Sequence, residues 1–143
     1  MIVRDGALVA DLGTVHRCLS SAVLGGGLGT IRTWLNAQVP PDYGRADPED
    51  DLAARATRLA LAAPVVGMLT AADVGRHTQG ARGGARALAT VGVEWALAAA
   101  GGRPRPVPPV GTINLLVLTE APLDDAGLVN ALQSSVEAKA QAL

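Results

Sequence analysis

Apolar and polar positions predict strands along much of the first third of the chain. Residues 1–12 alternate loosely around Gly6, which predicts a pair of short strands with the glycine at the break. A further strand is predicted over residues 17–24, and a glycine loop follows over residues 25–29. The pattern of residues 30–39 fits a helix or a strand.

The first clear helix signal begins at Asp47, which stands at an N-cap position with Pro48 as the first helical residue. Three acidic residues follow in the first turn, where carboxylates oppose the helix dipole. We therefore predict a helix over residues 48–62. Its single apolar stripe, which is expected to lie on a sheet, is formed by Leu52, Ala56, Leu59 and Ala63.

Two short apolar runs later in the chain predict buried strands, over residues 64–71 and 111–120. The polar, glycine-rich stretch 73–86 predicts a turn or a mobile loop. Residues 86–93 predict a strand that continues into an alanine-rich helix. Four prolines make residues 103–110 an extended connector.

The longest predicted helix covers residues 124–142, because the turn before it ends in aspartates suited to an N-cap. Strands that alternate with helices favour the α/β or α+β class over an all-β sandwich. We expect one domain over residues 1–143, with a mixed sheet and helices packed on it.

The composition argues against nucleic acid and membranes as partners. Thirteen acidic and twelve basic residues give a formal charge of -1, so the chain has no bulk field for a polyanion or an anionic bilayer. The aromatic side chains needed to stack on single-stranded bases are scarce: they are Trp34, Tyr43 and Trp95. Any binding is expected to come from a shaped site.

The cysteine and histidine content predicts neither a disulfide nor a metal centre. Cys18 has no second cysteine to pair with, and His16 and His77 stand far apart in the sequence. No apolar run reaches the roughly 18 residues of a membrane span. We therefore expect a cytoplasmic protein without a metal. Its core is expected to have few large side chains, which favours homo-oligomerisation as a source of stability.

Lys139 is the only lysine in the chain, whose other basic residues are all arginine. On an ideal helix it lies inside the apolar stripe formed by Leu128, Leu132 and Val136, whereas Glu137 points nearly opposite. An ammonium on a buried face requires a partner or a chemical role. The alternative is structural, because a cation near a helix C-terminus is stabilised by the dipole and its stem can reach water.

The glycine loop suggests an anion site, but its spacing does not match a known fingerprint. A strand, a glycine turn and a helix start can aim backbone N–H groups at a phosphate. Counted from Gly25, however, the sixth position is Thr30, and no Walker sequence is present. Ser20 and Ser21 precede the loop without the surroundings of a nucleophile elbow, so a structural role is the alternative.

Five short blocks, taken in order, resemble the adenosylcobinamide amidohydrolase family. The resemblance covers residues 19–143, and a Gly-Thr-Ile-Asn strand followed by a Glu-Ala-Lys helix end is its most specific part. It implies a hydrolase of corrinoid salvage that cuts an amide of adenosylcobinamide to give adenosylcobyric acid and aminopropanol, with a corrinoid substrate and no cofactor consumed. The blocks are "LSSAVLGGGL" at 19–28, Asn36, "GMLTAADV" at 67–74, "GTIN" at 111–114 and "EAKAQAL" at 137–143.

Amide hydrolysis needs a nucleophile, a donor set for the tetrahedral oxyanion and a proton for the leaving amine. Ser20, Ser21 or Thr70 is the candidate nucleophile or orients the attacking water. Asn114, with the glycine-loop amides, is the candidate oxyanion site, and Lys139 the candidate proton carrier. The expected substrate-binding residues are Gly25, Gly26, Asn36, Thr90, Thr112 and Glu137.

Three positions depart from the family pattern and support an alternative. Leu24 stands where an asparagine usually precedes the paired glycines, and Glu94 and Trp95 replace small polar residues. A corrinoid-binding or sensing module that keeps the pocket without the chemistry would suit these changes.

The substitution Lys139→Met tests the role of the single lysine. We expect this variant to keep the fold, measured by circular dichroism, and to lose amide hydrolysis, measured as aminopropanol released from adenosylcobinamide. Full activity in the variant would remove the lysine from the mechanism.

Overall fold

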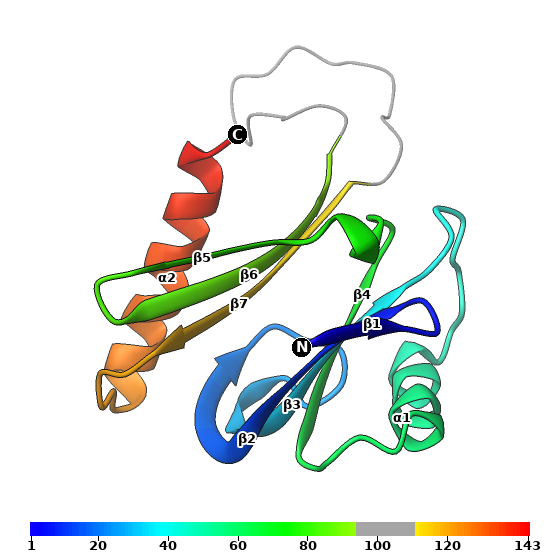
Figure 1. The fold of residues 1–143 in the computed structure, drawn as a ribbon, viewed down its shortest axis with the longest axis horizontal. Coiled ribbons are helices and arrows are strands. Elements are labelled where there is room, and N and C mark those ends of the chain that lie inside the picture. The colour runs from blue at the N-terminus through cyan, green and yellow to red at the C-terminus, as the bar shows by residue number, and fades with distance from the viewer. Residues whose placement is uncertain (94–110) are drawn as a thin grey trace.

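Two β-sheets and two α-helices make up the chain in a computed structural model, which describes residues 1–93 and 111–143 (Figure 1). The α/β fold class expected from the sequence is confirmed. The elements in chain order are β1 (Ile2–Arg4), β2 (Ala7–Ser20), β3 (Gly27–Gln38), α1 (Pro48–Arg58), β4 (Val65–Thr70), the 3-10 turn η1 (Val74–Arg76), β5 (Thr78–Arg82), β6 (Ala85–Gly92), β7 (Thr112–Thr119) and α2 (Asp125–Gln141).

The first sheet, sheet A, is mixed and has the strand order β1-β2-β3-β4. Its first three strands pair antiparallel, whereas β3 and β4 pair in parallel. Parallel neighbours require a crossover connection, and α1 supplies it. The pattern of residues 30–39 fitted a helix or a strand, and the structure shows a strand, because β3 pairs with β2 on one side and β4 on the other. Only an extended segment can form backbone hydrogen bonds with two neighbouring strands.

The second sheet, sheet B, is an antiparallel meander in the order β5-β6-β7. The prediction of a loop over residues 73–86 was wrong, since β5 and the start of β6 form a hairpin there. Its two-residue turn places Gly83 and Gly84 at φ values of 57° and 79°. Such a turn needs positive φ at both positions, so the glycines that indicated a loop are hairpin residues.

The sheets and α1 form layers with two apolar cores (Figure 1). One core lies between α1 and sheet A and contains Leu35 and Leu52, both with no exposed area. The other lies between the two sheets, where Trp34 and Val66 of sheet A meet Leu88 of sheet B. Sheet A is therefore buried on both faces, and its inner face contacts the second sheet.

Helix α1 confirms the predicted start but is shorter than expected. Pro48 is its first residue, yet the side chain of Asp47 makes no capping hydrogen bond and instead binds Arg45. The helix ends at Arg58 rather than at residue 62, because Ala60 adopts a left-handed φ of 51°. Its predicted apolar stripe is buried at Leu52, Ala56 and Leu59, but the fourth predicted member, Ala63, lies beyond the helix and is exposed.

Helix α2 begins as predicted, with the Asp124 carboxylate accepting a hydrogen bond from the amide of Gly127 at 2.8 Å. The expectation that its apolar stripe is buried was wrong. Val129, Leu132 and Val136 are 47%, 38% and 50% exposed, and no residue of the helix is buried. Helix propensity and the Asp124 cap therefore account for the helix, whereas tertiary packing covers a different face from the one that the apolar stripe predicted.

One face of α2 is more covered than the rest. Its residues follow one another at intervals of about one turn and are all partly exposed: Leu128, Ala131, Ser135 and Lys139. At its first turn, Asp125 forms an ion pair with Arg17 of β2, which ties the helix to sheet A. The lysine therefore lies on the covered side of the helix with Leu128 of the predicted stripe, whereas Leu132 and Val136 of that stripe are exposed.

The other predicted strands agree with the structure at β1, β2, β4, β6 and β7. The strand predicted over residues 17–24 is wrong at its end, because β2 runs from Ala7 and stops at Ser20. The glycine loop predicted over residues 25–29 is shorter than expected, because Gly27 already belongs to β3. The helix predicted after residue 93 and the connector at residues 103–110 lie outside the described residues.

Removing side-chain volume between α1 and sheet A should destabilise the fold. Leu52→Ala is expected to lower the free energy of unfolding by about 2–5 kcal/mol, because Leu52 has no exposed area and its loss leaves a cavity. Val129→Ala, on the exposed face of α2, serves as the control and should change it by less than about 0.5 kcal/mol. Urea unfolding measures both, and equal effects would contradict the described core.

Candidate active site

A buried cluster of polar side chains joins the two sheets. Asn36 of β3 donates from Nδ2 to Oγ1 of Thr90 in β6 at 2.8 Å. Asn114 of β7 donates from Nδ2 to Oδ1 of Asn36, also at 2.8 Å. The exposed fractions of Asn36, Thr90 and Asn114 are 0%, 0% and 5%. Three residues predicted for the site from sequence therefore meet within hydrogen-bonding distance.

The orientation of both amides in the cluster is set by a backbone carbonyl. Nδ2 of Asn114 also donates to the carbonyl oxygen of Leu69 in β4, at 2.8 Å. Since a carbonyl can only accept, the Asn114 atom that faces it must be the nitrogen. The same nitrogen faces Asn36, whose oxygen must then point toward it, and the nitrogen of Asn36 is left to donate to Thr90.

This arrangement determines what Asn114 can offer to a reacting group. Both of its N–H bonds are used, one toward Asn36 and one toward Leu69. The atom left for further bonding is Oδ1, which is an acceptor. A donor role toward an oxyanion would require one of the two hydrogen bonds to break, so in this conformation Asn114 is suited to holding a water or an amide N–H.

Thr70 lies next to the cluster, because it follows Leu69 at the end of β4. It is 1% exposed, and its Oγ1 accepts a hydrogen bond from the amide of Ala72 at 3.0 Å. The hydroxyl proton remains to be donated elsewhere. Thr112 begins β7 opposite Gly92, two pairs beyond the Thr90–Asn114 pair. It therefore shares a sheet face with Asn114.

The inner face of sheet B changes from polar to apolar along its length. Successive same-face pairs of β6 and β7 are Thr90 with Asn114, Leu88 with Leu116, and Arg86 with Leu118. The hydrogen-bonded cluster is thus continuous with an aliphatic surface, because alternate residues of a strand lie on one face.

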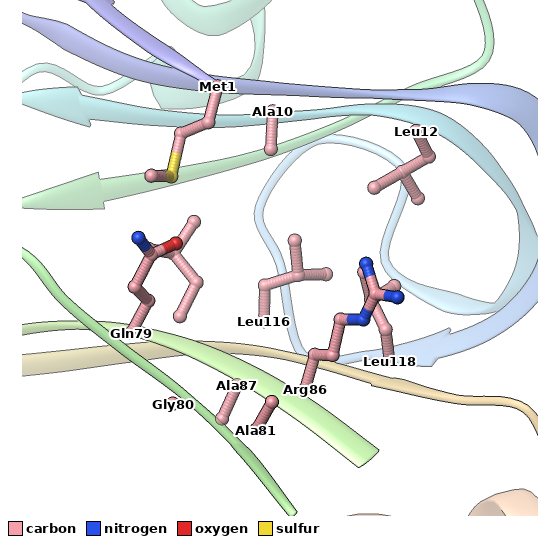
Figure 2. A pocket seen from close by; sticks show the side chains of 11 residues that line it. Met1, Ala10, Leu12, Gln79, Gly80, Ala81, Arg86, Ala87, Leu116 and Leu118 are labelled. Carbon is pink, nitrogen blue, oxygen red and sulfur yellow. The ribbon is translucent and has the colours of Figure 1, made fainter. Parts of the chain in front are cut away.

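That aliphatic surface lines a cavity of about 380 Å³ between the sheets. Figure 2 shows Ala10 and Leu12 on one side and the side chains of sheet B on the other. Gln79 and Arg86 are the polar side chains of the lining, and they lie toward opposite ends of the cavity with Leu116 between them. Sequence reasoning missed both residues, because the strand that carries Gln79 was interpreted as a loop.

The predicted residues of the glycine loop form a second group at the other end of β4. Leu24 and Gly67 exchange two backbone hydrogen bonds, of 3.1 and 2.9 Å, which attach the loop to that strand. A Cβ at Gly25 would lie 2.7 Å from the carbonyl oxygen of Val65, and one at Gly26 would lie 2.2 Å from that of Ala22. Both glycines are needed for close backbone contact within the chain.

Ser20 and Ser21 stand immediately before this loop. Oγ of Ser20 accepts a hydrogen bond from the amide of Ala22 at 3.1 Å, whereas Ser21 is exposed. Lys139 and Glu137 form a third group on α2, partly exposed and exposed respectively. The described residues show no hydrogen bond between Lys139 and Asn114. The sequence-predicted site is thus distributed over three places.

Burial affects two groups that could otherwise be considered for chemistry. It raises the pKa of the Cys18 thiol, against an opposing hydrogen bond from the Gly29 amide, which disfavours the reactive thiolate. Partial burial also raises the pKa of Asp51, but hydrogen bonds from Arg55 and Tyr43 outweigh it and lower the pKa. Asp51 therefore serves the first turns of α1 as a paired carboxylate.

The whole chain matches a family of amide hydrolases. The match covers residues 1–143, and the family is described as adenosylcobinamide amidohydrolase. The protein belongs to this family, as the order of its sequence blocks indicated. No curated protein and no solved structure matches the chain.

Two further findings on the described residues concern metal ligands and membrane spans. Within residues 1–93 and 111–143, no group of three or more His, Cys, Asp or Glu side chains is placed to hold a metal ion. Neither helix of that part of the chain combines the length and the apolar character needed to cross a membrane.

The hydrogen bond between Asn36 and Asn114 can be measured by a double-mutant cycle. Asn114→Leu leaves the oxygens of Asn36 and Leu69 without a donor, at about 1–3 kcal/mol each. Asn36→Leu is similarly costly, but the double variant should cost less than the sum, with a coupling of about 0.5–3 kcal/mol. The exposed Asn130→Leu on α2 is the control. Additive effects in urea unfolding would show that the two amides do not interact.

Proposed function

We propose that this protein hydrolyses the amide bond that joins aminopropanol to the corrinoid in adenosylcobinamide, giving adenosylcobyric acid. The family match over the full length of the chain is the observation that carries this proposal. Water supplies a hydroxyl group to the new carboxylate and a proton to the leaving amine, so the reaction consumes no nucleotide or redox cofactor.

The junction of the two sheets is the best-supported place for the chemistry. The hydroxyl of Thr70 can donate a hydrogen bond, and Oδ1 of Asn114 can accept one from a substrate or water. Thr70 acts as the nucleophile or orients the attacking water, and Asn114 holds the substrate amide or that water. Because both side chains are almost fully buried, strands or side chains must move before substrate reaches them.

The remaining assignments complete the proposal. Asn36 and Thr90 keep Asn114 in its orientation and thereby act on substrate binding through it. Thr112 lies on the same sheet face and extends the polar surface toward the beginning of β7. Lys139 supplies the proton to the leaving amine, supported by its place on the covered face of α2.

The other candidate residues stay in the proposal in secondary roles. Ser20 and Ser21 are alternative nucleophiles to Thr70, with the glycine-loop amides of Gly25 and Gly26 as the matching oxyanion donors. Glu137, exposed on α2, contributes to substrate binding from the solvent side.

A second candidate function is corrinoid binding without hydrolysis. The observation that favours it is the state of the polar cluster, in which both N–H bonds of Asn114 are already used within the protein. A cluster whose hydrogen bonds are formed within the protein makes the junction of the sheets rigid beside the cavity. A rigid junction beside a cavity is sufficient for a binding module.

We also propose a cytoplasmic protein that forms a homo-oligomer. The support for association is the exposed apolar area on and just after α2, where Val129 and Val136 of the helix are 47% and 50% exposed and Leu143, beyond its end, is 58% exposed. Burying such side chains against a second copy would stabilise both chains.

Amide hydrolysis is tested by incubating the protein with adenosylcobinamide and measuring released aminopropanol by mass spectrometry. The wild-type chain should release it. Thr70→Val removes the hydroxyl at nearly constant volume and should lower kcat by about 100-fold or more. Thr119→Val is a matched control, because Thr119 also accepts a hydrogen bond from the amide two residues ahead but lies exposed at the end of β7.

The outcomes separate the two candidate functions. Undiminished release by Thr70→Val would exclude Thr70 from the reaction. A wild-type protein that shifts the visible spectrum of the corrinoid without releasing aminopropanol would support the binding module instead.

A further inference from the structure

The cavity between the sheets has the walls of a site for a flat, mostly apolar group. Leu12 projects into it from sheet A (Figure 2), and Leu88, Leu116 and Leu118 line it from sheet B. A small-molecule site typically combines such apolar walls with a few polar groups that fix the orientation of the ligand.

The polar groups of the cavity stand at its two ends. Gln79 offers a carboxamide that can donate and accept at once, and Arg86 offers a planar set of donors (Figure 2). Neither side chain forms a hydrogen bond or an ion pair with another residue in the described parts of the chain. The lining contains no carboxylate, so the donors of Gln79 and Arg86 suit a ligand that is rich in acceptors.

The size of the cavity limits the ligand further. Its volume of about 380 Å³ is at the lower end of the range of small-molecule pockets, roughly 300–1,000 Å³. A nucleoside fits such a space, whereas a corrin macrocycle with its side chains does not. A purine has apolar faces and an edge with adjacent donor and acceptor groups, which a glutamine carboxamide can pair with in two hydrogen bonds.

We propose that this cavity binds the 5′-deoxyadenosyl group of the corrinoid, a deduction that rests on the proposed function. The adenine lies between Leu12 and the leucines of sheet B, with its edge paired to Gln79. Arg86 donates to the ribose oxygens. The macrocycle stays outside the cavity, and the cavity thereby selects corrinoids that carry a nucleoside on cobalt.

The position of the cavity agrees with the place proposed for the chemistry. Thr90 follows Arg86 by four residues on the same face of β6, about 13 Å along the strand. In the substrate, the adenosyl group is bonded to cobalt at the centre of the macrocycle, and the amide to be cut lies at the end of a peripheral arm. A nucleoside in the cavity and an amide at the polar cluster are therefore separated by a distance that half of the macrocycle and its arm can span.

The proposal is tested with two corrinoids that differ in the upper ligand. Affinities for adenosylcobinamide and for dicyanocobinamide, which lacks the nucleoside, are measured by spectral titration. We expect Gln79→Ala and Arg86→Ala each to weaken binding of the adenosyl form about 3- to 10-fold, the effect of one or two hydrogen bonds, and to leave the cyanide form unchanged. Arg82→Ala, an exposed arginine of the same hairpin outside the cavity, is the matched control.

Equal weakening of both corrinoids, or no change in either, would overturn the adenosyl site while leaving the proposed hydrolysis intact. If the wild-type protein binds neither corrinoid, the proposed function fails and the cavity is tested alone with 5′-deoxyadenosine. Shifts of leucine methyl NMR signals at millimolar nucleoside that disappear in the Gln79→Ala/Arg86→Ala variant support the site. Absence of such shifts overturns it.

Discussion

The hydrogen bond between Asn36 and Asn114 is the polar connection on which the arrangement of the two sheets depends. It joins β3 of sheet A to β7 of sheet B across 78 residues of sequence, and Asn114 extends it to the backbone of β4. Apolar contacts between the sheets tolerate sliding, because the hydrophobic effect is not directional. A buried amide pair does not tolerate it, since a small displacement leaves polar groups unsatisfied at a cost comparable to a whole hydrogen bond.

The same face of sheet B that carries this cluster also lines the inter-sheet cavity. Alternation along β6 places Thr90, Leu88 and Arg86 in one row, so the register that satisfies the cluster also sets the distance to the cavity. A change in register by one residue would turn all three side chains to the other face. The polar cluster therefore positions the lining of the cavity as well as the candidate catalytic groups.

The candidate residues found from sequence separate into those that the fold brings together and those that it keeps apart. Asn114 reaches the carbonyl of Leu69, next to Thr70, because β4 and β7 lie in different sheets that face each other. Gly25 and Gly26 serve close backbone contact at the other end of β4, a requirement that resembles a ligand cradle in sequence but is satisfied by the chain itself. Gln79 carried no signal, because a glycine-rich hairpin and a loop have the same composition.

The sequence by itself determined the features that depend on neighbouring residues: the proline start of α1, the Asp124 cap of α2, the apolar runs of β4 and β7, and the family. Only the tertiary structure decided which strands pair, that residues 30–39 are extended, and which face of α2 is covered. The physical reason is that capping and alternation act over a few residues, whereas pairing and burial depend on segments far apart in the chain. Val136 shows the difference: its spacing predicted burial, but it is 50% exposed.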